Sequence, residues 1–158
     1  MNTSLVDIAK GYVESETPKR RERAEERLNQ LRKKYGPGGG WRLIQPGPLW
    51  EACEIWLDET RQFGHAIVDH VLQQADARRL LGHPGEVENL RHFMYEWANR
   101  EQEEYIMPSF QAFMAERGIK VDQQVGNTRE QVEYRIAQAT KEFLTKIFEA
   151  GQAARAAS

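Results

Sequence analysis

The sequence predicts an all-α fold, a bundle of about five helices with a Gly/Pro-rich loop after the second helix. Three observations lead to this prediction. Apolar residues recur at steps of three and four over most of the chain, which is the spacing of one helix face. No alternating segment of strand length appears, and Gly/Pro clusters separate the periodic segments. A chain of 158 residues with 40% hydrophobic side chains suits a single helical domain, 1–158.

The first 35 residues are predicted to form two N-terminal helices. One runs from about Thr3 to Glu16. Thr17 and Pro18 mark its boundary, because threonine caps a helix whose first turn tolerates proline. The second helix, residues 19–35, carries a stripe of mostly basic residues at steps of three and four, which share one side of a helix: Arg20, Arg23, Arg27, Gln30 and Lys34.

A Gly/Pro-rich loop is predicted for residues 36–48, which contain five glycines and three prolines. Within it, Trp41 and Arg42 are candidates for partner recognition by stacking and by charge. The alternative is that Trp41 anchors the loop on the bundle. The loop lacks the Gly-Lys-Ser/Thr sequence of phosphate-binding loops, so nucleotide binding of that kind is not expected.

The bundle core is expected over residues 49–155. One helix should run from Pro48 to about Leu81, and the connection 82–85 should place the next helix antiparallel to it. That helix is predicted from about Glu86 to Met107, Pro108 should kink it or start a new helix ending at Gly118, and Asn127 or Thr128 should cap the last helix. The regular apolar stripe of the last helix predicts either a core element or the seam of a homodimer.

Charge is distributed unevenly along the chain, although its net value is only −2. Residues 18–36 hold eight Lys or Arg against three Glu, whereas the remainder holds 14 basic and 21 acidic residues. Such asymmetry predicts either a polyanionic partner for the basic segment or internal docking of the basic helix on an acidic bundle.

Histidines and carboxylates at helical spacing raise the question of a metal site. Glu88, His92 and Glu96 follow one another at steps of four, as do His65 and Asp69. The helix phase turns both histidines away from their apolar stripes, so we expect them to face solvent. We therefore predict no metal site and no cofactor.

A second candidate is a buried polar site of Glu101, Glu104 and Tyr105. Glu101 projects onto the apolar face between Trp97 and Tyr105, and Glu104 lies about 60° away from it. A carboxylate in that position is desolvated unless a cation or donor meets it. An internal arginine partner and a polar pocket are both consistent with this pattern.

The single cysteine, Cys53, falls on a predicted core face, which makes it a poor nucleophile and suggests a reducing compartment. No secretory signal and no stretch of about 20 apolar residues is present, so we expect a cytoplasmic protein that does not enter a membrane. The leading hypothesis is a non-enzymatic adaptor or accessory subunit that binds a protein through Arg20, Arg23, Arg27, Lys34, Trp41 and Arg42. The alternatives are a nucleic-acid-binding accessory protein that uses the same basic helix, and a small-molecule or metal-binding bundle around Glu101 and Glu104.

Overall fold

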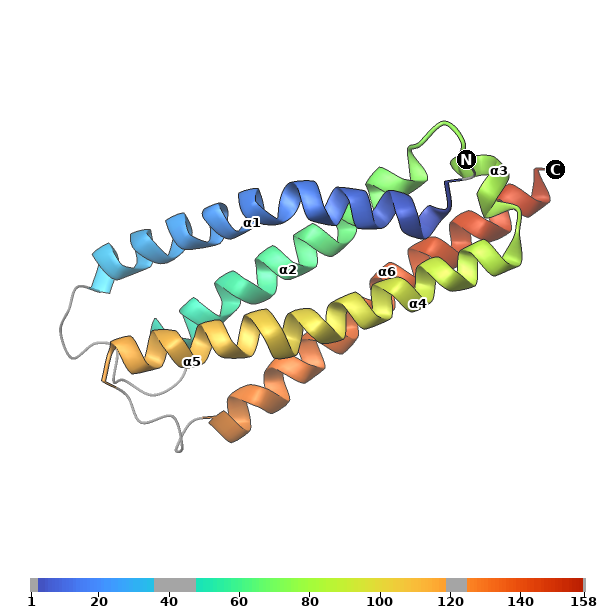
Figure 1. The fold of residues 1–158 in the computed structure, drawn as a ribbon. Helices are drawn as coiled ribbons and strands as arrows, with labels where there is room; N and C mark the ends of the chain where they lie inside the picture. Colours follow the sequence, from blue (N-terminus) through green and yellow to red (C-terminus); the bar gives the residue numbers. More distant parts are fainter. Residues whose placement is uncertain (1–2, 36–47, 119–124, 158) are drawn as a thin grey trace.

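The computed structural model describes residues 3–35, 48–118 and 125–157 (Figure 1). In these residues the fold is all-α, as predicted, and no strand occurs. The elements are α1 (Leu5–Tyr35), α2 (Pro48–Leu72), the short α3 (Ala77–Leu81), α4 (Pro84–Arg100), the π-helical turn η2 (Glu101–Ile106), α5 (Met107–Glu116) and α6 (Val125–Ala156).

Two helical hairpins stack side by side to form the bundle (Figure 1). In the first hairpin α1 packs antiparallel to α2, and in the second the rod of α4, η2 and α5 lies along an antiparallel α6. The hairpins are stacked so that α1 runs parallel to α4 and α2 runs parallel to α6. The two helices expected to pack on each other, α2 and α4, therefore lie diagonally across the bundle. The short α3 covers the end of the bundle where the chain passes from the first hairpin to the second.

An offset of 81 residues recurs among the partners across both parallel interfaces. Between α1 and the second hairpin the offset joins Leu5 to Glu86 and Arg20 to Glu101. Between α2 and α6 the same offset joins Glu54 to Arg135, Arg61 to Glu142 and His65 to Lys146. The two hairpins thus have matched lengths and stack in register.

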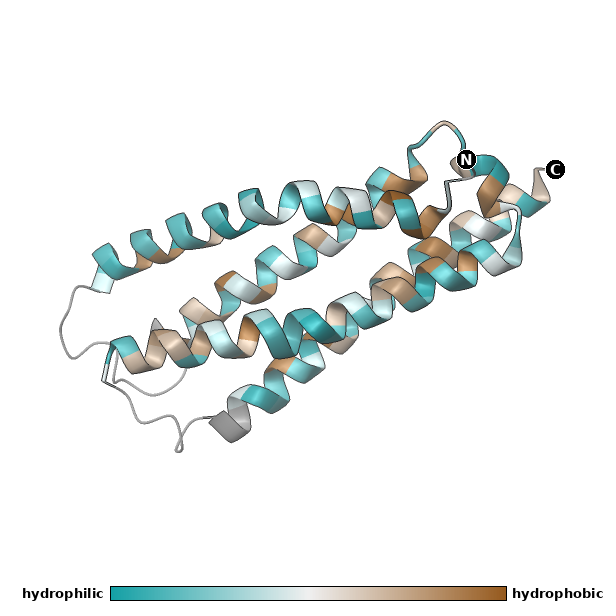
Figure 2. Ribbon diagram, in the orientation of Figure 1, coloured by the Kyte–Doolittle hydropathy of each residue, from teal (hydrophilic) through white to brown (hydrophobic). Residues whose placement is uncertain are grey.

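Part of the core lies between α2 and α6, where the helices approach closely. Ile67, Phe143 and Ile147 are completely buried. Gly64 faces the ring of Phe143, and a Cβ atom added at Gly64 would lie 2.1 Å from the Phe143 Cζ atom. Figure 2 shows by contrast that α1 is hydrophilic along most of its length. Glycine at position 64 therefore sets the spacing of the two helices.

The prediction of two N-terminal helices is wrong, because α1 continues through Pro18. Leu5 before the proline and Leu28 after it are both buried in the core, so packing on both sides of the proline outweighs the backbone hydrogen bond that proline cannot make. Thr17 is inside the helix, and its hydroxyl donates to the Val13 carbonyl at 2.5 Å.

The helix predicted from Pro48 is shorter than expected. It ends at Leu72 instead of Leu81, and α3 follows after a turn. Ala77 and Leu81 of α3 are buried, which explains their helical apolar spacing without a continuous helix. At the other end of the chain, α6 begins at Val125, before the predicted cap residues.

The rod of α4, η2 and α5 contains a π turn that was not predicted. Its core residues follow one another at steps of four: Met94, Ala98, Gln102, Ile106, Phe110 and Met114. On a regular α-helix such a stripe drifts by about 40° per step. A π turn takes up one extra residue and returns the stripe to the core, with the Met107 N–H bonded to the Gln102 carbonyl. Pro108 lies in the first turn of α5, as one alternative predicted, and Gly118 follows the helix with φ of 72°.

Candidate functional site

The predicted basic stripe lies along the seam between α1 and α2. Arg27 Nη1 lies 2.9 Å from Asp58 Oδ2 and 3.1 Å from Glu59 Oε1. Arg23 Nε lies 3.6 Å from Glu59 Oε2. In the last turn of α1, Lys34 Nζ lies 3.6 Å from Glu51 Oε2. These contacts correspond to internal docking of the basic helix, and binding of a partner by Arg23, Arg27 and Lys34 stays a prediction.

Arg20 is completely buried, so the expectation that it lies on an exposed basic face is wrong. Its Nη1 atom donates to Glu101 Oε2 at 2.5 Å, and its guanidinium lies between the rings of Phe63 and Tyr105, 4.6 Å from each centroid. The second hairpin covers this part of α1, which removes Arg20 from solvent. Arg20 is therefore the internal arginine partner that was one of the two alternatives for Glu101.

The π turn positions both partners of Arg20. Glu101 and Tyr105 are one turn apart and both face the guanidinium, whereas Glu104 is exposed and lies outside this cluster. Burial raises the pKa of the Tyr105 hydroxyl, and the positive charge of Arg20 opposes that rise. Among the described residues, no group accepts a hydrogen bond from Nε or Nη2 of Arg20.

A groove of about 270 Å³ runs between α1 and α5 and reaches back to Tyr105. Its floor is apolar and consists of side chains that are at most 4% exposed: Ala24, Leu28, Trp56 and Phe113. The residues that line it from each rod recur at steps of three and four, so two helix faces form its walls.

The two ends of the groove differ in charge. At one end Arg32 lies over the Phe113 ring and bonds to two carboxylates, Glu25 at 2.8 Å and Glu116 at 3.2 Å. At the other end the exposed Arg21 lies 5.3 Å from the Tyr105 ring centroid. Within the described ranges Arg21 has no carboxylate partner, so this end of the rim is positive.

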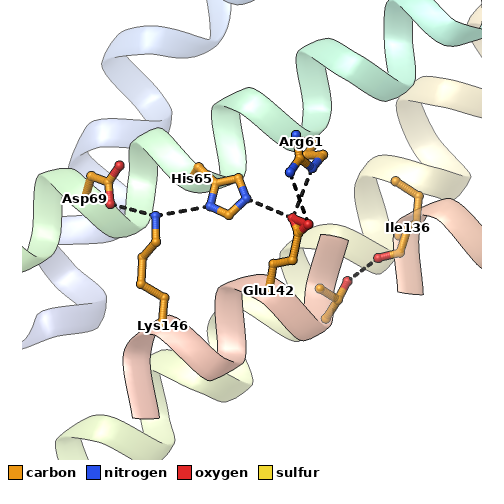
Figure 3. Close-up of polar contacts among 7 residues, drawn as sticks. Arg61, His65, Asp69, Ile136, Glu142 and Lys146 are labelled. Atoms are coloured by element: carbon orange, nitrogen blue, oxygen red, sulfur yellow. Dashed lines mark hydrogen bonds and ion pairs between the residues drawn. The ribbon is translucent and has the colours of Figure 1, made fainter. Parts of the chain in front are cut away.

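A second polar cluster lies between α2 and α6 on the surface (Figure 3). His65 Nε2 lies 3.0 Å from Glu142 Oε2, and His65 Nδ1 lies 3.2 Å from Lys146 Nζ. Lys146 also donates to Asp69 at 2.8 Å, and Arg61 makes two hydrogen bonds to Glu142. Both ring nitrogens of His65 are therefore occupied, which leaves neither for a reacting group.

The predicted orientation of the histidines is right for one and wrong for the other. His92 is exposed and pairs with Glu96 at 3.0 Å. His65 is only 24% exposed, because its ring packs edge-on against Phe143 with centroids 4.9 Å apart. Its phase on α2 is the one expected, but α6 covers that side of the helix.

Neither a cluster of metal ligands nor an exposed thiol occurs among the residues that the structure describes. Across residues 3–35, 48–118 and 125–157, no set of three His, Cys, Asp or Glu side chains lies close enough to hold a metal ion. Cys53 is on the core face, as predicted, and burial raises the pKa of its thiol to about 12. None of the helices in the described part of the chain has the length and apolar composition that a bilayer crossing needs. Trp41 and Arg42 lie outside the described residues.

Comparison with protein-family models, with curated proteins and with solved structures gives no match. The candidate site therefore rests on the geometry of the groove and of the Arg20 cluster behind it. Sequence reasoning missed the groove because it depends on the register of α1 against α5. The step-of-four stripe from Met94 to Met114 was the signal that this rod departs from a regular helix.

Proposed function

We propose that this chain is a non-enzymatic helical interaction protein that binds a segment of another protein in the groove between α1 and α5. The observation that carries the proposal is the apolar floor, which is open between two charged helix edges. Helix faces that form a groove with an apolar floor and a polar rim suit an amphipathic segment.

The dimensions of the groove favour side chains of a protein partner over a cofactor. Pockets for drug-sized ligands occupy about 300–1,000 Å³ and enclose most of the ligand. The groove is smaller, at about 270 Å³, and open along its length. From Arg21 to Arg32 it follows about 16 Å of α1, or three helical turns. Three turns present the apolar positions that a partner helix uses as anchors.

The basic helix supports a nucleic-acid interface less well than its sequence suggested. A phosphate group would have to displace Asp58 and Glu59 from Arg27, and Glu51 from Lys34. Exchanging one anion for another weakens the gain from counterion release, which drives such binding. Nucleic-acid binding by this face stays the second hypothesis, with anisotropy of a labelled DNA duplex at two salt concentrations as its test.

The proposal is tested by site-specific photo-crosslinking in the cells that produce this protein. A compact diazirine side chain is placed at Ala112, which lines the groove, or at Ala115, an exposed residue of the same helix that does not. We expect a discrete adduct from position 112 that position 115 does not give, with an amphipathic segment at the crosslinked site. The same adducts from both positions, or none from position 112, would overturn the proposal.

A matched pair of substitutions checks that the adduct reports binding. Ala112→Arg places a long charged side chain over the floor, whereas Ala115→Arg adds the same charge to solvent. We expect the first to abolish capture of the crosslinked partner by purified protein and the second to preserve it. Equal melting temperatures of the two variants establish that the difference is local. Equal capture by both variants contradicts a docking site in the groove.

A further inference from the structure

We propose that the segment bound in this groove carries a carboxylate, which Arg21 receives at the Tyr105 end. The inference rests on the proposed function and adds to it the chemistry and the orientation of the partner. It commits to an amphipathic peptide segment whose apolar side chains lie on the floor and whose acidic side chain lies at one end.

The unequal pairing of the two rim arginines carries this inference. Arg32 holds two carboxylates of the protein itself, Glu25 and Glu116, so its charge is already compensated. Arg21 lies over the face of Tyr105, and no carboxylate of the described residues pairs with it. An incoming acidic group gains most where the positive charge is uncompensated. The two ends of the groove therefore differ in charge, and the Arg21 end is the more positive.

The Arg20 guanidinium, which is paired with Glu101, lies at the same end of the groove. It is located between the rings of Tyr105 and Phe63, 4.6 Å from each centroid. Only its Nη1 atom is bonded, to Glu101, while Nε and Nη2 have no acceptor within the described part of the chain. A buried guanidinium with one anion and two unused donors favours negative charge nearby. Tyr105, whose ring contacts both arginines, forms the wall between Arg20 and the groove.

The test uses a small probe that contains an aromatic ring and a carboxylate. Sodium benzoate is titrated into the full-length protein, and benzamide, which has the same shape without the charge, is the matched probe. Binding is followed by two-dimensional NMR of the arginine Nε–Hε signals and of the Ala112 methyl group. We expect benzoate to move the Arg21 and Ala112 signals saturably and to bind at least ten-fold more tightly than benzamide.

Substitutions assign the charge preference to Arg21. Arg21→Gln should remove the preference for benzoate, and Arg21→Glu should reverse it in favour of benzylammonium. Arg79→Gln changes an exposed arginine of α3 that has no carboxylate partner among the residues the structure describes, and it should leave both affinities unchanged. Both positions are on the surface, so all three variants should fold.

The outcomes separate this inference from the proposed function. Equal binding of benzoate and benzamide at Ala112 overturns the carboxylate preference and leaves the groove as a docking site. Benzoate binding that persists in Arg21→Gln, or that moves signals only elsewhere, also overturns the inference. If the Ala112 crosslink is absent while Arg21-dependent benzoate binding is present, the charge preference stands and the protein-docking function fails.

Discussion

Charge is buried where α1 meets η2 and remains in contact with water where α2 meets α6. Arg20 is completely buried and Glu101 is 13% exposed, whereas Arg61 and Glu142 are 52% and 40% exposed. Between α2 and α6 the charged cluster lies outside a dry contact of Gly64 with Phe143. The first interface thus depends on an ion pair within its core, and the second depends on apolar packing that an ion cluster borders.

The difference shows that the location of an ion pair matters more than the number of ion pairs. Exposed pairs contribute about 0–1 kcal/mol each, because water and salt screen them. A buried pair gains more from mutual attraction but has lost its hydration, so removal of one partner leaves an uncompensated charge. Loss of one charged partner should therefore destabilise the first interface much more than the second.

The largest effect is expected from Glu101→Gln. This change leaves the Arg20 guanidinium buried without its anion and should lower the free energy of unfolding by about 3–5 kcal/mol. The double variant Arg20→Met/Glu101→Leu should recover most of that loss, since it removes both charges. Urea denaturation of the three proteins measures the effect. If the double variant is as unstable as Glu101→Gln, the two side chains stabilise the fold through contacts other than the attraction between their charges.

A smaller loss is expected from Gly64→Ala, because the added methyl group overlaps the Phe143 ring. Overpacking of this kind costs about 1–3 kcal/mol. Gly11→Ala is the matched control, since nothing lies within 4 Å of the Cβ atom that it adds and alanine favours a helix by about 1 kcal/mol. Thermal unfolding should show opposite shifts of the melting temperature. A shift of the same sign would place the close approach of α2 and α6 in doubt.

The smallest effect is expected from Glu142→Gln in the surface cluster, less than about 1 kcal/mol at neutral pH. Hydrogen bonds from Arg61 hold the pKa of Glu142 below its ordinary value. A carboxyl group with a lowered pKa contributes stability above its unfolded pKa and loses that contribution as the pH falls through its folded pKa. Wild type and variant should therefore converge in stability below about pH 4, and their difference at neutral pH should shrink in molar salt. A difference that grows in acid would contradict the assignment.

The fold class could be predicted because three-four spacing of apolar residues is a local signal. Glu101 could likewise be recognised as core-facing, since its neighbours Trp97 and Tyr105 fix its phase, and an internal arginine partner was one of two alternatives for it. The identity of that arginine could not be predicted. Arg20 and Arg27 belong to one stripe with one spacing, and only the stacking of the second hairpin buries the former and leaves the latter half-exposed.

The predicted helix boundaries at Pro18 and Leu81 were wrong for a related reason. Pro18 resembles a helix start, yet burial on both sides of it keeps α1 continuous. Leu81 matches the spacing of α2, yet it belongs to a separate helix that covers the end of the bundle. The groove requires α1 and α5 to be placed in register across 84 residues of sequence, and no local pattern contains that information.

The matched offset of the two parallel interfaces would let two copies of this chain exchange hairpins. Each hairpin is a complete unit, and one segment, residues 73–83, joins them. The contacts between hairpins do not depend on which chain supplies each one, so a domain-swapped dimer in which two chains exchange hairpins makes the same contacts as the monomer. The conformation of that connecting segment, and not the interface, therefore selects between the two assemblies.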